Sequence, residues 1–317
     1  MINKAKLKDY TDKLFYLTSR FGIKTAYKLK IQPLLTHYIT NHGKGDRLDL
    51  EFQAIKDYLI TIITPVIQKY SNIPESTIPI KENDIIWVCW WQGEQEMPLL
   101  VNKCYELLKR HANKHPIKLI TKNNFKEYIT LPPKILELFE AKSIPIQQFS
   151  DIMRMYLISH YGGIWIDATY WVTQNIEIPQ DAPFLSAKTN NIFDSFVARG
   201  KWSINLLGGS KGSKLYGFIY DSLIEYWHKR KFFIDYFQTD YLVQIAYERF
   251  PDIKSNIDKY ALTCPNLINI DLNQTNDMNL INKIIHDNAF IKLSWKKNYH
   301  KYDNNNNLTI YGYFLQL

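Results

Sequence analysis

The chain contains few cysteines, and their positions suggest neither a cross-linked scaffold nor a metal-bound one. Cys89, Cys104 and Cys264 are odd in number and far apart in the sequence. This spacing matches neither a disulfide framework nor a zinc site. The pattern is typical of a protein in a reducing compartment, so we expect the chain in the cytoplasm.

Long apolar runs are also lacking. The longest run, residues 58–67, has about half of the roughly 20 residues that a membrane-spanning helix needs. The first residues do not show the charged-then-apolar pattern of a secretory signal peptide. We therefore expect a soluble protein, or one bound peripherally at the inner face of the cell membrane.

Several common catalytic motifs are absent as well. The chain has no Walker-type glycine loop, no Gly-x-Ser-x-Gly segment and no His-Glu-x-x-His helix. The glycine-rich segment 208–213 superficially suggests phosphate binding, but it lacks the P-loop spacing and a preceding buried strand. We expect it to form a turn or a loop on the acceptor side of a site.

The residues that are present indicate a globular protein with a basic surface. Hydrophobic residues make up 46% of the 317 positions and charged residues 22%, which is enough to build a large core. Aromatic residues reach 15%, and the net charge is +8. This charge favours anionic partners such as nucleotide sugars, lipid phosphates, membrane surfaces or nucleic acid. A lysine-rich solvated surface without such a partner explains the charge equally well.

The pattern divides the chain into a helical N-terminal extension, residues 1–80, and a larger domain, residues 81–317. The extension has few glycines, and Pro65 should end or kink its second helix, which we expect over residues 48–70. One interpretation is a basic amphipathic segment on an anionic membrane. The favoured alternative is an extension packed on the catalytic domain. Its basic residues are Lys4, Lys6, Lys8, Lys13, Lys24, Lys28 and Lys30.

Strands and helices alternate from residue 85 onward, which is typical of the α/β class with a largely parallel sheet. The predicted strands include 85–91 and 117–121, and the predicted helices include 98–111, 214–229 and 232–250. Ligands bind beyond the carboxyl ends of strands in such sheets. Trp90, Trp91, Gln92 and Asp167 lie at or near predicted strand ends. Further short segments are expected at 184–187, 290–295 and 308–311.

Residues 150–171 are the most informative segment of the chain. Ser150 is a suitable N-cap for a helix that should end at Gly162, and a strand should then follow over residues 164–172. Asp151 and Arg154 are three residues apart and would share a helix face. Asp167 and Thr169 would share a strand face. Two polar pairs on rigid elements suit a site that orients a polar ligand.

The string Ser150-Asp151-x-x-Arg154, followed by Tyr-Gly-Gly-Ile-Trp-Ile-Asp-Ala-Thr at 161–169, resembles sugar transferases with a DXD motif. It is most similar to bacterial capsular polysaccharide synthesis proteins, with similar strings in the catalytic core of the large clostridial glucosylating toxins. The resemblance runs from about residue 85 to residue 295. It implies a GT-A-like fold in which the Asp-x-x-Arg helix and the DXD strand bind a nucleotide sugar.

This resemblance also implies a reaction and its partners. The protein would be a retaining glycosyltransferase that moves galactose or glucose from a UDP-hexose to a polyprenyl-diphosphate-linked saccharide, with no nucleic acid involved. A GDP- or CDP-linked donor is an alternative. One of two adjacent tryptophans would stack on the uracil, and a late Ser-Trp pair would close over the diphosphate. The implied donor-binding residues are Trp90, Trp91, Gln92, Asp151, Arg154, Asp167, Thr169, Ser294 and Trp295.

The motif departs from its usual form at the third position, where Thr169 stands in place of a carboxylate. The resemblance implies Mn²⁺ or Mg²⁺ at Asp167, but a threonine hydroxyl is a poorer ligand for either ion. His286 and Asp287 are alternative late ligands. A weak metal site, a water-mediated one and metal-independent activity all stay open.

Asp240 is the first candidate for a catalytic residue besides Asp167. A polar side chain beneath the anomeric carbon can stabilise an oxocarbenium-like transition state. Gln238, Asp194 and Asn205 are the next candidates, and a purely structural hydrogen bond is the competing interpretation for Asp240. A rival from a different class is a basic, non-catalytic module that binds nucleic acid or anionic lipid. The rival explains the charge and the aromatic residues but leaves the 150–169 string unexplained.

Overall fold

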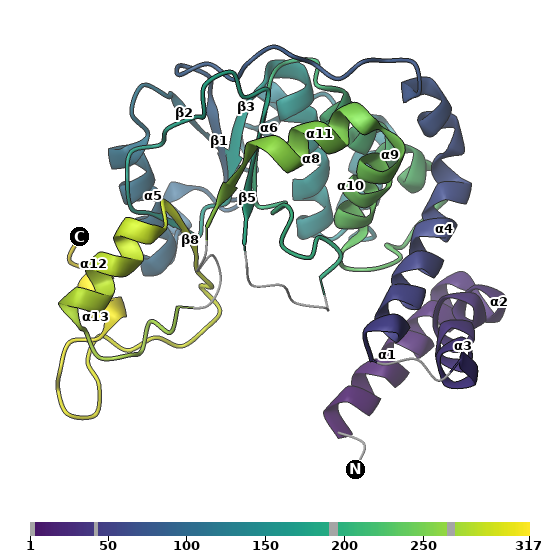
Figure 1. The fold of residues 1–317 in the computed structure, drawn as a ribbon, viewed down its shortest axis with the longest axis horizontal. Coiled ribbons are helices and arrows are strands. Elements are labelled where there is room, and N and C mark those ends of the chain that lie inside the picture. Colours follow the sequence, from purple (N-terminus) through teal and green to yellow (C-terminus); the bar gives the residue numbers. More distant parts are fainter. Residues whose placement is uncertain (1–3, 41–43, 190–195, 265–269) are drawn as a thin grey trace.

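A mixed sheet runs through the middle of the molecule in the computed structural model (Figure 1), which describes residues 4–40, 44–189, 196–264 and 270–317. Within these residues the sheet has six strands in the order β2-β1-β3-β6-β5-β7. β6 is antiparallel to both neighbours, and the other pairs are parallel. The predicted α/β class is therefore confirmed. The strands are β1 (Ile86–Cys89), β2 (Ile117–Ile120), β3 (Gly163–Ile166), β5 (Phe184–Lys188), β6 (Leu206–Gly209) and β7 (Ala261–Thr263).

Successive side chains along the strands enter two separate hydrophobic clusters, as the alternation of a buried sheet requires. On β3, Trp165 faces one cluster, while Ile164 and Ile166 face the other. The Trp165 side packs against α4 (Lys44–Tyr70), α7 (Pro133–Glu140), α8 (Ile146–Tyr161), α9 (Lys214–Lys229), α10 (Gln238–Arg249) and α11 (Pro251–Tyr260). The opposite side packs against α5 (Leu99–His111), α12 (Met278–Asp287), α13 (Ile310–Phe314) and the small antiparallel sheet of β4 (Tyr170–Val172) and β8 (Phe290–Lys292).

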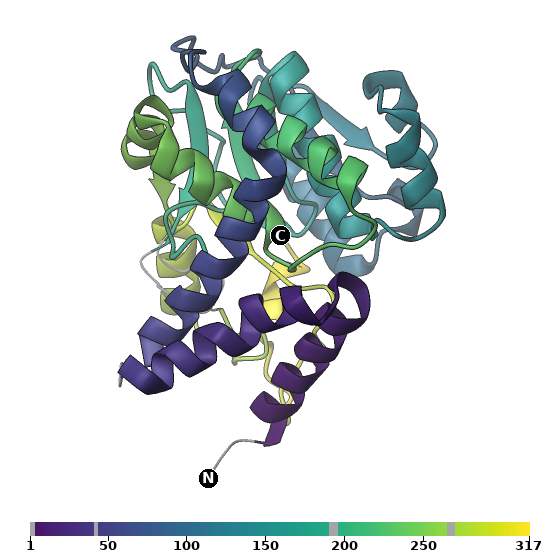
Figure 2. The same ribbon diagram turned by 90° about the vertical axis from the view of Figure 1, so that its right-hand side faces the viewer.

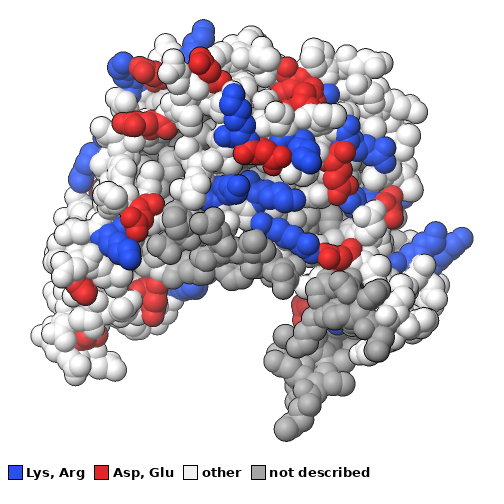
Figure 3. Space-filling model, viewed as in Figure 1, with Lys and Arg blue, Asp and Glu red and all other residues white. Residues whose placement is uncertain are grey.

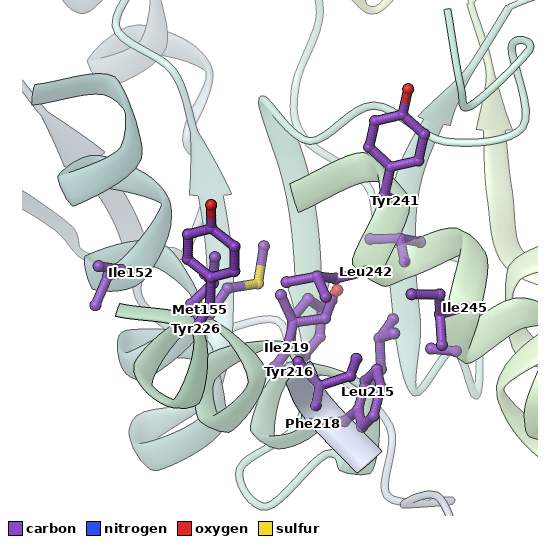
Figure 4. Packing of buried hydrophobic residues seen from close by; sticks show 14 of the residues in the cluster. Ile152, Met155, Leu215, Tyr216, Phe218, Ile219, Tyr226, Tyr241, Leu242 and Ile245 are labelled. Atoms are coloured by element: carbon purple, nitrogen blue, oxygen red, sulfur yellow. The ribbon is translucent and has the colours of Figure 1, made fainter. Parts of the chain in front are cut away.

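The helices that carry the candidate site residues are fixed by an apolar interface (Figure 4). Ile152 and Met155 of α8, Ile219 of α9, and Leu242 and Ile245 of α10 all belong to one buried cluster. All five side chains are fully buried. Burying one such side chain contributes about 1.5–3 kcal/mol. This packing holds the polar residues of α8 and α10 in fixed positions relative to the sheet.

The N-terminal helices project from the sheet-bearing part of the molecule (Figures 1 and 2). They are α1 (Lys4–Phe21), α2 (Ile23–Ala26), a π-helical turn (Tyr27–Ile31) and α3 (Gln32–Thr40). The Tyr16 hydroxyl donates to the Phe233 carbonyl at 2.8 Å and so ties α1 to the segment before α10. No helix in the described part of the chain has both the length and the apolar character needed to cross a bilayer.

Helix α4 continues through Pro65, so of the two expected effects of this proline, an end or a kink, the end is wrong. Pro65 lacks a backbone N–H and cannot complete the regular hydrogen-bond pattern. Packing along α9 compensates, because Leu59, Ile62 and Ile63 are buried there. The Lys229 ammonium of α9 also donates to the Ile62 carbonyl at 2.9 Å. Tertiary contacts therefore maintain the helix where local propensity would break it.

Two other local predictions differ from the structure. The 232–250 helix begins only at Gln238. Helix α8 begins at Ile146, directly after Pro145, so Ser150 lies inside the helix and is not its N-cap. Pro145 sets the start of α8. The short segment expected at 308–311 contains the N-cap of α13, where the Thr309 side chain accepts the Gly312 N–H. The remaining short helices are α6 (Phe125–Tyr128) and a 3₁₀ turn (Glu94–Glu96).

Candidate functional site

Arg154 of α8 joins the two polar pairs that the sequence singles out. Its Nη1 lies 3.1 Å from Asp151 Oδ1, and its Nη2 donates to Asp167 Oδ1 at 3.1 Å. Nη1 also donates to the Ile204 carbonyl at 2.6 Å, and the guanidinium lies 4.8 Å above the Trp165 ring. The Arg154 side chain is only 6% exposed. The Asp-x-x-Arg pair is therefore a buried bridge between two carboxylates and not an exposed surface ion pair.

Asp167 lies in a turn at the carboxyl end of β3. The Tyr170 N–H donates to the Asp167 carbonyl at 3.1 Å, which closes the turn between β3 and β4. The prediction of one continuous strand over residues 164–172 is therefore wrong, and Asp167 and Thr169 do not share a strand face. The turn forms because each strand must enter a different sheet. It leaves the Asp167 side chain 27% exposed and open to a ligand.

Three donors hold the Asp167 carboxylate. Besides Arg154, Trp165 Nε1 donates to Oδ1 at 2.8 Å, and Lys292 Nζ donates to Oδ2 at 3.1 Å. Burial alone would raise the pKa of Asp167, but the charges of Lys292 and Arg154 and these hydrogen bonds together lower it below its ordinary value. Asp167 is therefore anionic at neutral pH.

Lys292 is a functional candidate that the sequence does not reveal. It lies on β8, directly opposite Tyr170 of β4, and the Leu293 N–H donates to the Thr169 carbonyl at 2.9 Å. This register brings Lys292 Nζ to both the Asp167 carboxylate and the Thr169 hydroxyl, which each accept a hydrogen bond from it. β4 and β8 have three residues each, and no local pattern indicates that such short strands pair.

A second carboxylate group lies between α8 and α10. Asp151 Oδ2 accepts a hydrogen bond from Thr239 at 2.7 Å, and Asp240 Oδ1 accepts one from Trp202 Nε1 at 3.0 Å. Burial raises the pKa of Asp151, although Arg154 and Thr239 oppose the change. Burial also raises the pKa of Asp240 to about 7. The hydrogen bond from Trp202 lowers this pKa, whereas the negative charge of Asp151 raises it further. Asp240 therefore keeps its proton to a higher pH than an ordinary aspartate does.

The other catalytic candidates have structural partners or lie outside the described residues. Gln238 is buried, and its Oε1 accepts the Ile234 N–H at 3.2 Å before α10. Asn205 Oδ1 accepts hydrogen bonds from Ser203 at 2.6 Å and from the Tyr170 hydroxyl. Asp194 falls outside the residues that the structure describes.

The two adjacent tryptophans after β1 have different surroundings. Trp91 packs within a cluster of Phe125, Phe139 and Phe149, with ring centroids 5.2–5.6 Å away. Trp90 instead meets Trp295 edge-to-face at 5.7 Å, and Trp295 is 46% exposed. The structure thus brings together two predicted donor-binding residues that are about 200 positions apart in the sequence. Gln92 is exposed in the turn after β1, and Ser294 directly precedes Trp295.

The late metal-ligand candidates lie apart from this arrangement. His286 is 89% exposed on α12, and its Nδ1 lies 3.1 Å from Asp287 Oδ1. Across residues 4–40, 44–189, 196–264 and 270–317, no three histidine, cysteine or acidic side chains are grouped so that they could hold a metal ion.

The glycine-rich segment 208–213 is partly a strand. Gly208 and Gly209 belong to β6. A turn was predicted for the whole segment, but only the residues after Gly209 form one, and it leads into α9. The first N–H groups of α9 donate to Glu75, whose Oε1 accepts from Lys214 and whose Oε2 accepts from Leu215, both at 2.9 Å. A helix N-terminus attracts anions, but here a carboxylate of the chain itself already occupies that position.

Replacing Asp240 by asparagine should change how stability depends on pH. A carboxyl whose folded-state pKa is raised to about 7 stabilises the fold below its unfolded-state value, near 3.9, and this contribution is lost as the pH rises through 7. Asparagine mimics the neutral acid and stays neutral. Asp240→Asn should therefore raise the melting temperature more at pH 8 than at pH 5.5. An equal change at both pH values would contradict the raised pKa, and Asp12→Asn on the exposed face of α1 is the control.

Removing the Arg154 bridge should destabilise the protein. Arg154→Met leaves the Asp151 and Asp167 carboxylates, 16% and 27% exposed, without their shared partner. We expect the free energy of unfolding, measured with urea, to fall by about 3 kcal/mol, the low end for a broken buried ion pair. Arg154→Lys should give an intermediate loss, because an ammonium lacks the planar fork that reaches both carboxylates. A methionine variant as stable as the wild type would show that the bridge contributes nothing.

Comparison with known proteins identifies the family. The chain matches the model for capsular polysaccharide synthesis proteins over residues 38–314, and the predicted resemblance over 85–295 lies inside this range. No curated protein matches the chain. Among solved structures it is similar to one titled PaToxG glycosyltransferase, with 14% identity and a TM-score of 0.41, over 66% of this chain and 83% of that one. Because the family match spans most of its length, the chain belongs to the family of capsular polysaccharide synthesis proteins.

Proposed function

We propose that this glycosyltransferase of capsular polysaccharide synthesis transfers a hexose, galactose or glucose, from a UDP-sugar with retention of anomeric configuration. The observation that carries the proposal is the bridge from Asp151 through Arg154 to Asp167 at the carboxyl end of β3. Carboxylates held in this way accept hydrogen bonds from sugar hydroxyls in fixed directions. Trp90 and Trp295 offer aromatic surface for the uracil in the same part of the fold.

Asp240 is our candidate for the group that acts on the sugar during transfer. Asp151 lies close enough for its charge to raise the pKa of Asp240, and Asp240 as a whole residue is only partly buried. The ionised form would stabilise positive charge at the anomeric carbon. Since its pKa is raised to about 7, turnover that depends on this ionised form should rise with pH between 6 and 8.

Release of free nucleotide from a panel of UDP-, GDP- and CDP-hexoses tests this proposal. We expect slow hydrolysis of one UDP-hexose in the absence of acceptor, and loss of that hydrolysis in the Asp167→Asn protein. Nuclear magnetic resonance of the first sugar released would report whether configuration is retained. Absence of hydrolysis, together with no thermal shift from UDP or any nucleotide sugar, would contradict the proposal.

We further propose that the acceptor is a polyprenyl-diphosphate-linked saccharide, reached at an anionic membrane surface by way of the N-terminal helices. These helices expose large apolar side chains beside the exposed basic residues Lys24 and Lys28. Such a mixture suits the interface of an anionic bilayer. Lys30 does not contribute, because it is buried in an ion pair with Glu51. The exposed apolar residues are Phe15, Ile23, Tyr27, Leu35, Tyr38 and Ile39.

Removing two of these side chains should weaken membrane binding. Tyr38 and Ile39 of α3 are 72% and 82% exposed, so a Tyr38→Ser, Ile39→Ser double variant should fold normally. We expect at least about a tenfold loss of affinity for vesicles that contain anionic lipid, with donor hydrolysis unchanged. Tyr302→Ser, in the exposed C-terminal loop, is the control. Unchanged co-sedimentation of the double variant with vesicles would contradict this role.

The non-catalytic rival is not favoured. Figure 3 shows lysine and arginine side chains gathered across the middle of one face, but acidic side chains lie among them. A surface that tracks a nucleic acid backbone is usually basic over a continuous stripe. Steeply salt-dependent binding of oligonucleotides, without any binding of nucleotide sugars, would support the rival.

A further inference from the structure

The group formed by Asp167, Thr169 and Lys292 does not fit the divalent metal that a DXD motif implies. Such a metal needs oxygen ligands with lone pairs directed at it. Asp167 Oδ1 already accepts from Arg154 and Trp165, and Oδ2 accepts from Lys292. The Thr169 hydroxyl also accepts from Lys292. The ammonium group thus lies between the two side chains that would bind the metal.

An ammonium in this position opposes a metal for two reasons. Nζ carries a positive charge, so it repels a divalent cation at short range. It also has no lone pair to offer as a ligand. Thr169 in the third position of the motif agrees with this, because a carboxylate there would favour the metal and a hydroxyl does not.

We propose that Lys292 takes the place of the divalent cation, so that the enzyme binds its donor diphosphate and turns it over without a metal. This inference rests on the proposed function. Nζ has three hydrogens; two are directed to Asp167 and Thr169, and the third has no acceptor within the described part of the chain. The side chain is 21% exposed. The lysine side chain is therefore partly accessible, and an ammonium is a common phosphate-binding group.

The position of Lys292 is fixed in the way that such a role requires. β8 pairs with β4 in a defined register, and the Leu293 N–H is bonded to Thr169, so the lysine stem starts from a rigid strand. Nζ also lies 5.4 Å above the Tyr170 ring. A cation held before the donor arrives stabilises charge without reorganisation during the reaction.

The charges balance through the transfer. The bond between C1 of the hexose and the diphosphate oxygen breaks with both electrons left on that oxygen, and C1 bonds to the acceptor oxygen. The proton of the acceptor hydroxyl passes to the diphosphate. Lys292 takes no part in this proton transfer, and its charge offsets the negative charge that develops on the leaving group.

Metal binding and nucleotide binding test the proposal separately. Titration of Mn²⁺ into the wild-type protein, followed by electron paramagnetic resonance without nucleotide, should leave the signal of free Mn²⁺ unchanged. Calorimetry should give the same UDP affinity in EDTA and in Mn²⁺. Lys292→Met should weaken UDP binding by roughly 10- to 100-fold, while Lys292→Arg should retain most of it.

Two further variants complete the design. Lys118→Met, at an exposed position on β2, is the matched control and should bind UDP like the wild type. The double variant Thr169→Asp, Lys292→Ala restores a carboxylate pair without the ammonium, so it should bind Mn²⁺ and require it for UDP. Circular dichroism melting would verify that each variant is folded.

Opposite outcomes separate this inference from the proposed function. Mn²⁺ bound by the wild type and released by Asp167→Asn, or UDP affinity lost in EDTA, would overturn the role of Lys292. So would an unchanged UDP affinity in folded Lys292→Met. Failure of the wild type to bind any UDP compound would instead overturn the proposed function. It would also overturn the proposed binding of the diphosphate by Lys292. The Mn²⁺ titration would still decide whether Asp167 holds a metal.

Discussion

Replacing Asp167 by asparagine is expected to lower donor turnover by about 10²- to 10³-fold, as loss of a preorganised electrostatic group in a catalytic site commonly does. Asparagine keeps an oxygen that can accept from Trp165 and Arg154, so the fold should persist. It lacks the negative charge that both Arg154 and Lys292 contact. Hydrolysis of a UDP-hexose and thermal melting, measured together, would separate the two effects.

Alanine at the same position should behave differently. From the sequence alone, Asp167→Ala would be expected to leave the melting temperature nearly unchanged. The structure changes that expectation, because alanine would leave the Arg154 guanidinium, 6% exposed, with one carboxylate fewer. In addition to the lost turnover, we expect the free energy of unfolding to fall by about 3 kcal/mol, the low end for a broken buried ion pair.

Asp287→Asn provides the control for both Asp167 variants. This aspartate lies beside the exposed His286, and we expect wild-type turnover and stability after its replacement. Full activity of Asp167→Asn, or a comparable loss in Asp287→Asn, would refute the assignment of the site to the end of β3.

Replacing Gly163 by alanine is expected to prevent folding, or to lower the melting temperature by more than about 10 °C. Gly163 has a φ of +99°, and an added Cβ would lie 2.2 Å from the Ile85 carbonyl oxygen. That oxygen cannot move away, because it accepts the Ile164 N–H within the sheet at 2.9 Å. The glycine is therefore needed for close strand packing, and its place in the motif has a structural reason.

Gly93→Ala is the matched control for this prediction. Gly93 has a nearly identical φ of +101°, but its added Cβ would meet no atom within 4 Å. Alanine at Gly93 should lower the free energy of unfolding only by the cost of the strained backbone, about 1–3 kcal/mol. Similar melting temperatures for the two variants would show that the contact with Ile85 is unimportant.

The sequence predicts those parts of the site that depend on local spacing. Asp151 and Arg154 share a face of α8, as their spacing requires, and Gly162 ends that helix. The buried strand before Asp167 follows from its apolar run, whereas the turn that ends this strand at Asp167 was not predicted. Such features need only the three or four neighbours of a residue and the period of its element.

The parts that depend on distant pairing were not predictable. Lys292 reaches Asp167 only because β8 pairs with β4. The insertion of the antiparallel strand β6 between β3 and β5 is a second pairing of this kind. The difference between Trp90 and Trp91 has the same origin. Adjacent residues point to opposite sides of a strand end, and only the packed helices determine which side is closed.

The distance along the chain between Asp167 and Lys292 has a consequence for biosynthesis. The two residues are 125 positions apart, so a ribosome that adds about 5–20 residues per second needs roughly 6–25 s to pass from one to the other. During that interval the nascent chain contains Asp151, Arg154 and Asp167 but only one of the two cations that compensate them. A chain interrupted before Lys292 would carry the whole recognisable motif and still have an unbalanced, incomplete centre.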